Sequence, residues 1–211
     1  MHTSDSVTII RDNTANPAPI GLLGFGMTTI LLNIQNAGFF EMNTMILGMG
    51  IFVGGLAQVM AGFMEWKKNN TFGATAFTAY GMFWLTFVAI VLLPKTSFGA
   101  AFAPDATSMG CFLLLWGLFT LFMTIGTFRL SRMLQVVFIS LTILFFLLTI
   151  SEFTASASLK SLAGYEGIIC GLSACYGSMA LVLNEIYGRS VLPLGLVARK
   201  EPASSEAFSA A

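Results

Sequence analysis

Six long apolar runs, separated by short polar stretches, constrain this chain more than any other feature of its sequence. The hydrocarbon core of a bilayer is about 30 Å thick, and a helix needs roughly 20 apolar residues to cross it. The sequence therefore predicts an all-α integral membrane protein with six transmembrane helices. The runs that meet this length are residues 19–38, 42–64, 71–93, 109–128, 133–150 and 163–183.

Charged side chains are scarce, since they make up 9% of the 211 residues, whereas hydrophobic side chains make up 56%. So few ionic groups cannot solvate the surface of a globular domain. The formal net charge is zero, so the sequence offers no basic face for nucleic acid. We expect one transmembrane domain over residues 16–196, with a mobile lead over residues 1–15 and a mobile tail over residues 197–211.

Lysine and arginine are divided unequally between the two sides of the expected spans. Eight lie on the side that holds both termini, and two lie on the other side. Because positive charge disfavours translocation, we expect both termini in the cytoplasm and a multi-pass protein of the cytoplasmic (inner) membrane. The eight are Arg11, Lys67, Lys68, Arg129, Arg132, Arg189, Arg199 and Lys200, and the two are Lys95 and Lys160.

The sequence lacks the residues of a metal centre or a catalytic relay. Its only histidine is His2, and its three cysteines, Cys111, Cys170 and Cys175, all lie in apolar runs. A thiol in such a run behaves as a small buried hydrophobe. A Walker A motif is also missing. We therefore expect no metal site, no cofactor and no enzymatic activity.

Acidic residues are expected only near the ends of the spans. Glu65 and Glu185 fall at the cytoplasmic edge, and Glu41, Glu152 and Glu166 fall at the outer edge. With no ionisable residue expected near the middle of a span, the sequence does not predict a relay of carboxylates that moves protons across the membrane.

Neutral polar residues inside the spans are the main candidates for contact with a solute. An amide buried in lipid needs a hydrogen-bonding partner, so we expect Asn33, Gln58 and Asn184 to face the protein interior or a wet path. Thr28 and Ser173 are further candidate donors. A threonine hydroxyl can instead bond to a carbonyl of its own helix, which is its more common arrangement.

Three bulky side chains share one depth in the spans that start from the cytoplasmic side. Counting eight residues inward from residues 17, 72 and 133 gives Phe25, Tyr80 and Leu141. At about 1.5 Å per residue, each lies roughly 12 Å deep, near the centre of the bilayer. Phenylalanine and leucine are frequent in this chain, so the shared depth suggests a constriction without requiring one.

Several sequence blocks carry a resemblance to a known family. The blocks are "NPAPIGLLGFGMTTILLN", "GGLAQ", "NTFGATAFTAYGMFWLT", "ISLTILF" and "LNEIYGR". They resemble the acetate uptake transporter family, in the expected order and over about residues 16–195. The first block contains the family's Asn-Pro-Ala-Pro signature, here Asn16, Pro17, Ala18 and Pro19. Two departures are Ile20, where leucine is usual, and Val53, where tyrosine is common.

The resemblance implies a protomer of six helices, a ring-shaped homohexamer and a separate solute path through each protomer. It also implies a gate formed by Phe25 in "GFGM", Tyr80 in "TAYG" and Leu141 in "ISLT". Ala174 in "GLSAC" corresponds to a small residue that is associated with which solutes fit. The gate is the same trio that the depth count selects.

The function that the resemblance implies is transport of acetate and related small monocarboxylates, with succinate as a further candidate, in a channel-like or proton-linked manner. Thr28, Asn33, Gln58, Ser173 and Asn184 would donate hydrogen bonds to the solute, and the trio would select its apolar end. The nearest alternative is a channel for a small neutral solute such as ammonia, urea or water. A membrane-embedded enzyme and a purely structural oligomer are further alternatives.

The prolines of the signature suit the start of the first span. Proline is tolerated in the first turn of a helix because its missing N–H would have no partner there. The unpaired N–H groups near Asn16 and Ala18 would face the cytoplasmic vestibule, where a carboxylate could rest. Capping of the helix alone would explain the same residues.

Overall fold

The computed structural model describes residues 14–197, so most of the expected mobile lead and tail, residues 1–13 and 198–211, lies outside the described part. The described chain is all-α apart from one isolated β-bridge between Ser131 and Leu196. Its elements are α1 (Ala18–Asn36), α2 (Thr44–Met49), the π-helix η1 (Gly50–Ala57), α3 (Gln58–Lys67), α4 (Thr71–Leu92), the 3-10 helices η2 (Leu93–Lys95) and η3 (Ala100–Phe102), α5 (Ala106–Thr127), α6 (Arg132–Thr154) and α7 (Ala157–Tyr187).

Six stretches of helix are long and apolar enough to cross a membrane, which confirms the expected number. The second of them is continuous from Thr44 to Lys67 and combines α2, η1 and α3. The sequence underestimates the last span, because α7 begins at Ala157 and has 31 residues. The connector expected over residues 151–161 is wrong, since it shrinks to Ala155 and Ser156, with Ala155 in the left-handed conformation that ends α6.

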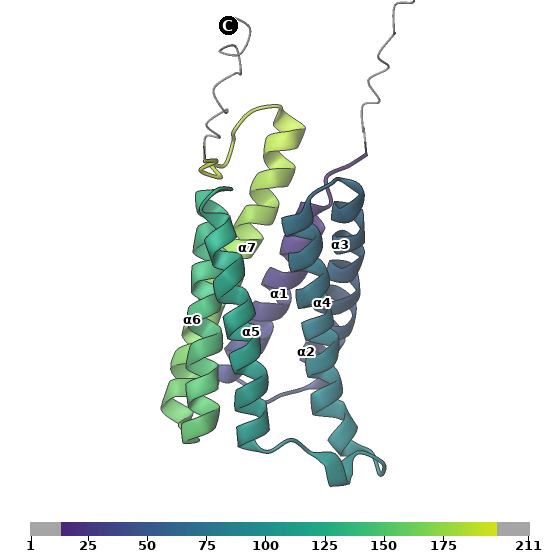
Figure 1. The fold of residues 1–211 in the computed structure, drawn as a ribbon, viewed down its shortest axis with the longest axis vertical. Coiled ribbons are helices and arrows are strands. Elements are labelled where there is room, and N and C mark those ends of the chain that lie inside the picture. The colour runs from purple at the N-terminus through teal and green to yellow at the C-terminus, as the bar shows by residue number, and fades with distance from the viewer. Residues whose placement is uncertain (1–13, 198–211) are drawn as a thin grey trace, which may run out of the picture.

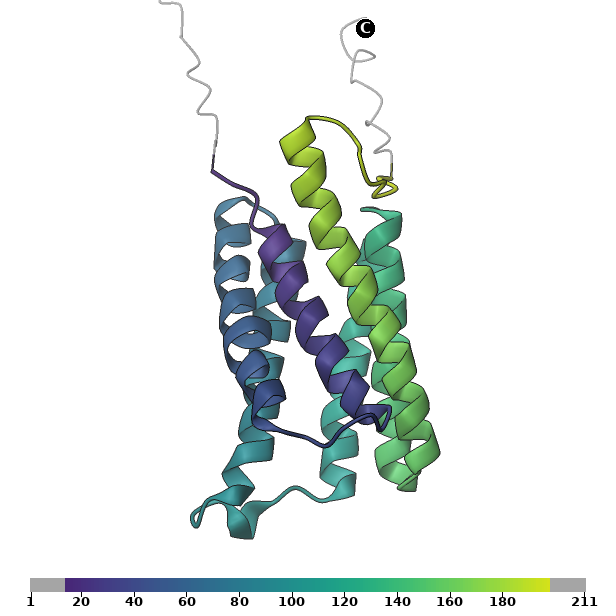
Figure 2. The ribbon, with the colours of Figure 1, turned by 180° about the vertical axis from the view of Figure 1, so that it is seen from behind.

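The helices form one upright bundle in which α1 lies between the α2–α3 span and α7 (Figures 1 and 2). α1 packs along α7, α6 packs between α5 and α7, and α3 packs against α4. The described chain begins and ends at the same end of the bundle, the top of Figure 1. We call this end the termini end.

The contact between α4 and α5 is made by side chains, because the backbones of the two helices do not approach each other closely. Phe83 of α4 lies 5.6 Å from Phe112 and 5.2 Å from Trp116, measured between ring centroids. Tyr80, one turn away on α4, lies 5.6 Å from Phe119 by the same measure. Aromatic pairs at these separations are favourable beyond the area that they bury. The rings therefore fill the space between two helices whose backbones make few contacts.

α1 and α7 approach each other closely because small residues line their contact. A Cβ atom on Gly164 of α7 would lie 2.3 Å from the backbone nitrogen of Ala37 and 2.8 Å from the carbonyl oxygen of Asn33. A Cβ atom on Gly171 would lie 2.7 Å from the carbonyl oxygen of Gly26. Glycine is required at such contacts because no other residue lets two helix backbones come so near.

Candidate functional site

A cavity of about 330 Å³ lies inside the bundle and reaches from the termini end to the expected gate. Asn16, Glu65, Asn70 and Ser131 line it near the termini end, and Gln58 lines it further in. The gate residues Phe25, Tyr80 and Leu141 also line it. Its other lining residues are Ala18, Leu22, Phe72, Gly73, Ala76, Phe77, Leu130, Met133, Leu134, Val137, Phe138, Leu181, Leu194 and Leu196.

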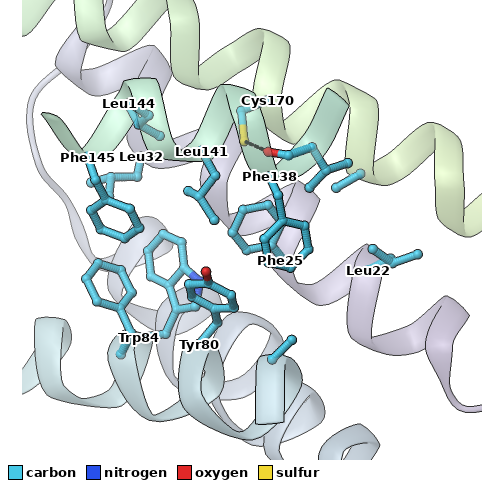
Figure 3. Packing of buried hydrophobic residues seen from close by; sticks show 14 of the residues in the cluster. Leu22, Phe25, Leu32, Tyr80, Trp84, Phe138, Leu141, Leu144, Phe145 and Cys170 are labelled. Carbon is cyan, nitrogen blue, oxygen red and sulfur yellow. Dashed lines mark hydrogen bonds between the residues drawn. The ribbon is translucent and has the colours of Figure 1, made fainter. Parts of the chain in front are cut away.

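The structure brings Phe25, Tyr80 and Leu141 together, as the depth count expects (Figure 3). They come from α1, α4 and α6, and 6%, 3% and 3% of their surfaces are exposed. The rings of Phe25 and Tyr80 have centroids 5.9 Å apart. Phe138, one turn before Leu141, also lines the cavity and has its ring 6.1 Å from that of Tyr80. Whether the trio selects solutes stays a prediction.

Tyr80 is held in place by a residue that the sequence does not single out. Its hydroxyl lies 2.9 Å from Thr120 Oγ1 of α5, and Thr120 Oγ1 also donates to the carbonyl of Trp116 at 2.7 Å. Since Thr120 Oγ1 gives its one hydrogen to Trp116, Tyr80 donates to Thr120. The bond fixes the ring in the cavity wall. In sequence, Thr120 looks like any other threonine in an apolar run.

This hydrogen bond predicts a difference between two variants. In Thr120→Val the buried Tyr80 hydroxyl loses its acceptor, which costs about 1–3 kcal/mol. In Tyr80→Phe the donor is removed, and Thr120 keeps its bond to Trp116, so we expect a smaller loss. Thermal unfolding in detergent should give a lower midpoint for Thr120→Val than for Tyr80→Phe, and the reverse order would contradict the assignment of Tyr80 as donor.

Gln58 meets the expectation that its amide faces the interior. It lies at the start of α3, directly after η1, is 1% exposed and lines the cavity. Its Oε1 is buried and has no hydrogen-bond partner in the described part of the chain. An unpaired buried acceptor is costly, so it indicates a place where a donor from a solute or water belongs.

The other two candidate donors of the first spans are not brought to the cavity. Thr28 is fully buried and donates to the carbonyl of Met49 at 3.4 Å, which ties α1 to the α2–α3 span. Asn33 donates to the carbonyl of Thr29 at 2.9 Å and accepts from Asn36. Its side chain fills the space next to Gly167 of α7. The polar atoms of both residues thus find partners within the protein: Thr28 bonds to another span, whereas the hydrogen bonds of Asn33 stay within α1.

The candidates of the last span also lie away from the cavity. Ser173 donates to the carbonyl of Cys170 at 2.6 Å and lines a separate hollow beside Pro193. Ala174 is fully buried in the core. Asn184 donates to the carbonyl of Leu192 at 2.8 Å and accepts from the Val191 and Leu192 N–H groups at 2.7 and 2.9 Å. Asn184 thus shapes the loop after α7.

That loop closes one side of the cavity, which the sequence does not predict. Carbonyls of Leu194 and Gly195 accept hydrogen bonds from the N–H groups of Met133 and Arg132, at 3.2 and 2.8 Å. Leu194 and Leu196 consequently line the cavity. The loop is held because it supplies acceptors for free N–H groups at the start of α6.

The signature residues begin α1 as expected. Pro17 is the residue before the helix, Pro19 lies in its first turn, and Asn16 Oδ1 accepts from the Ala18 N–H at 3.0 Å. The amide of Asn16 therefore caps the helix, and it takes up the first N–H that a carboxylate could have used. Asn16 and Ala18 line the cavity.

Glu65 stands out in the structure, although the sequence assigns it only to an edge. It is 3% exposed, and its Oε2 accepts from Asn70 Nδ2 at 2.7 Å. Glu65, Asn16 and Asn70 line both the main cavity and a second hollow at the termini end, which Lys68 and Glu185 also line. Glu65 is thus one of three residues that the two hollows share.

The expectation that no ionisable residue lies near the middle of a span is wrong for Glu166. α7 begins six residues earlier than expected, so Glu166 lies about 14 Å along it rather than at its edge. Its carboxylate accepts a hydrogen bond from the hydroxyl of Ser140, which precedes Leu141. Its second oxygen is buried and has no partner in the described residues. Neither Ser140 nor Glu166 lines the cavity.

Within residues 14–197, no group of three or more His, Cys, Asp or Glu side chains is placed to hold a metal ion. The cysteines are unpaired, with Cys170 fully buried and its thiol 3.6 Å from the carbonyl of Val137 (Figure 3). The arrangement of the cavity is that of an apolar passage with a few neutral polar groups and one carboxylate.

Comparison with known proteins gives a consistent result. The sequence profile of the GPR1/FUN34/yaaH family matches residues 3–193. The succinate-acetate/proton symporter SatP of Escherichia coli (strain K12) is 58% identical over 181 residues, which cover 86% of this chain and 95% of that protein. Ammonia transport outward protein 2 of Saccharomyces cerevisiae is 36% identical over 172 residues, which cover 79% of this chain and 61% of the yeast protein.

A solved structure of the bacterial acetate channel SatP has the same fold, with a TM-score of 0.85 and 57% sequence identity. The match covers 87% of this chain and 100% of the other. Since the two chains share more than half of their residues, the likeness extends beyond the course of the backbone.

Proposed function

Because this chain belongs to the GPR1/FUN34/yaaH family of multi-pass membrane proteins, we propose that it carries acetate and related small monocarboxylates across the cytoplasmic membrane. The observation that carries the proposal is 58% identity, over nearly the whole chain, to a succinate-acetate/proton symporter. The cavity supports it, since an apolar passage that ends at bulky side chains suits an acid with a small apolar group.

The proposed path runs along the cavity and through the trio. Gln58 offers an amide to the polar end of the solute, and Phe25, Tyr80 and Leu141 surround its methyl group. Ala174, although outside the cavity wall, packs in the same core and limits how far α7 can yield. Thr28, Asn33, Ser173 and Asn184 hold the surrounding helices and loop instead of touching the solute.

The proposed topology places the termini end in the cytoplasm, on the strength of the eight-to-two division of lysine and arginine. We propose a homohexameric ring as the assembly, as the family resemblance implies. Large side chains exposed on the outer faces of the bundle, such as Phe122 and Ile169, would there contact lipid or another protomer.

Ammonia is a second candidate solute, favoured by the resemblance to a yeast protein named for ammonia transport. Flux measurements on the purified protein in proteoliposomes distinguish an acetate transporter from an ammonia transporter. We expect labelled acetate to enter faster than into protein-free vesicles, and unlabelled acetate to compete. If the protein raised the permeation of ammonia, urea or water above that of protein-free vesicles but left acetate flux unchanged, the acetate proposal would be overturned.

Gln58→Ala should slow acetate uptake about fivefold without unfolding the protein. The expected loss equals roughly one hydrogen bond to the solute, about 1 kcal/mol. The fold should tolerate the change, because Gln58 Oε1 has no partner in the described protein that would be left unpaired. Uptake assays together with size-exclusion profiles test this, and unchanged uptake by the folded variant would remove Gln58 from the path.

A further inference from the structure

The hollow beside Pro193 opens sideways, on the outer face of the bundle, and we call it the side hollow. Its volume is about 330 Å³. It is lined by Arg132, Met133 and Val136 of α6, Ser173 and Tyr176 of α7, and residues 193–195 of the loop after α7. Val136 is 53% exposed and Tyr176 is 40% exposed, so the side hollow faces the surroundings of the protein. In a membrane, these surroundings are lipid.

The loop that walls the side hollow is attached to both helices, and Figure 2 shows it crossing from the end of α7 to the start of α6. The Tyr176 hydroxyl donates to the carbonyl of Pro193 at 2.9 Å, and the Arg132 N–H donates to the carbonyl of Gly195 at 2.8 Å. Gly195 has a φ of +62°, and a Cβ atom there would lie 2.7 Å from the Cβ of Arg132. Glycine therefore lets the loop pack directly on the stem of the arginine.

Arg132 is the one charged side chain among the described residues that line the side hollow. It is exposed, and its guanidinium group has no hydrogen-bond or ion-pair partner within residues 14–197. The backbone N–H groups of Arg132 and Met133 are already bonded to the loop, so the guanidinium group is what remains to bind an anion. Its planar set of donors matches the oxygens of a phosphate group.

The depth of the side hollow matches the layer of lipid head groups and the first part of the acyl chains. The candidate span of α6 begins at Arg132 itself, and Val136 lies about 6 Å deeper, at about 1.5 Å per residue. Exposed apolar side chains continue from the hollow toward the middle of the membrane, and these are Ile139 and Ile143 of α6 and Leu172 and Ile169 of α7. A phospholipid has the same order, with a charged head followed by apolar chains.

From these observations we propose that the side hollow binds an anionic phospholipid, with the phosphate on Arg132 and an acyl chain along Val136. Basic pockets between transmembrane helices on the cytoplasmic side are typical sites for such lipids. Met133 and Leu194 line both the side hollow and the main cavity. The bound chain therefore packs on the outer side of a wall of the main cavity and holds the loop after α7 in place. The inference goes beyond the proposed function, since it holds whichever solute is carried.

Native mass spectrometry of the delipidated protein in a neutral detergent tests this inference. The protein is titrated with phosphatidylglycerol, or with phosphatidylcholine that has the same acyl chains. We expect the first phosphatidylglycerol to bind at least fivefold more tightly, because its head group has no cationic choline to oppose Arg132. Excess glycerol 3-phosphate should not displace it, because this anion lacks the acyl chain that fills the side hollow.

Two variants remove the two parts of the site separately. Arg132→Gln removes the charge and keeps the backbone hydrogen bonds to the loop, whereas Val136→Trp keeps the charge and fills the side hollow. Each should lower the affinity for phosphatidylglycerol at least fivefold. Arg189→Gln and Ile125→Trp are the matched controls, since both residues are exposed and neither lines the side hollow. The controls should keep the wild-type affinity.

Hydrogen exchange measures whether the lipid holds the loop. The N–H groups of Val191 and Leu192 are bonded to Asn184, and the N–H of Val197 donates to the carbonyl of Leu130 at 3.0 Å. These amides exchange when the loop opens. Phosphatidylglycerol should slow their exchange at least fivefold in the wild-type protein and leave it unchanged in Arg132→Gln.

The outcomes separate this inference from the proposed function. Equal wild-type affinity for the two lipids would overturn the site, even if neither variant folds, and so would wild-type affinity in folded Arg132→Gln. Unchanged loop exchange in the lipid-saturated protein would overturn the holding of the loop. If lipid-free Val136→Trp lost the oligomeric state of the wild type, a second copy of the chain would fill the side hollow instead of lipid. A protein that binds phosphatidylglycerol as expected but moves no acetate would contradict the proposed function alone.

Discussion

Leu141→Ala is expected to let larger monocarboxylates, such as lactate, enter at rates comparable to acetate. Leu141 is 3% exposed and lines the cavity together with Phe25 and Tyr80, so removing most of its side chain widens the cavity beside these two rings. Phe25→Ala should have the same effect. We expect the ratio of lactate to acetate uptake by cells that carry each variant to rise at least tenfold, which corresponds to about 1.4 kcal/mol.

Leu144→Ala is the matched control for this experiment. Leu144 lies one turn further along α6, is 4% exposed and belongs to the same core, but it does not line the cavity. Both leucine variants should lose about 2–5 kcal/mol of stability by creating a void. Only the gate variants should alter selectivity. An unchanged profile in both Phe25→Ala and Leu141→Ala would remove the trio from the mechanism.

Gly164→Ala should separate α7 from α1 and lower the midpoint of thermal unfolding by about 5 °C or more. The added Cβ would meet the backbone nitrogen of Ala37 at 2.3 Å and its Cα at 2.7 Å. Backbone atoms cannot rotate away as a flexible side chain can, so the helices must shift at a cost of about 1–3 kcal/mol. Melting of the detergent-solubilised protein, followed by tryptophan fluorescence, measures the change.

The control for this change is Gly48→Ala in α2, where a Cβ would have no neighbour within 4 Å. Alanine favours the helical conformation over glycine by about 1 kcal/mol, so Gly48→Ala should keep or raise the midpoint. If Gly164→Ala were as stable as this control, the close approach of α1 and α7 would not require glycine.

Sequence periodicity and length predict the number of helices well, because a membrane span needs a long apolar run and this chain has six. Their ends are predicted less well. Residues 151–154 and 157–161 look like a connector because they are polar, yet they extend α6 and α7. Polar residues at a helix end show where the lipid ends rather than where the helical hydrogen bonds end, so the sequence places Glu166 too near the end of its span.

The sequence singles out the trio through the family resemblance, and the depth count agrees because depth along a helix follows directly from residue number. Which side of a helix a residue faces is harder to predict in spans that are apolar all round. Asn33 and Asn184 look like pore donors for this reason, although partners in the protein use their polar atoms. Thr120 matters because it accepts a hydrogen bond from Tyr80, which is 40 residues away in sequence. Glu65 matters because it lines the cavity, which only the folded structure reveals.

The central claim, that solute passes between Phe25, Tyr80 and Leu141, is tested most directly by blocking that point. Leu141→Cys is made in a protein whose native cysteines are replaced by Cys111→Ser, Cys170→Ala and Cys175→Ala, and Leu144→Cys serves as the control. Benzyl methanethiosulfonate adds a phenyl ring that the native leucine lacks, so it should stop acetate flux in Leu141→Cys proteoliposomes, and acetate should slow the labelling. Undiminished acetate flux after complete modification of Cys at position 141 would contradict the account.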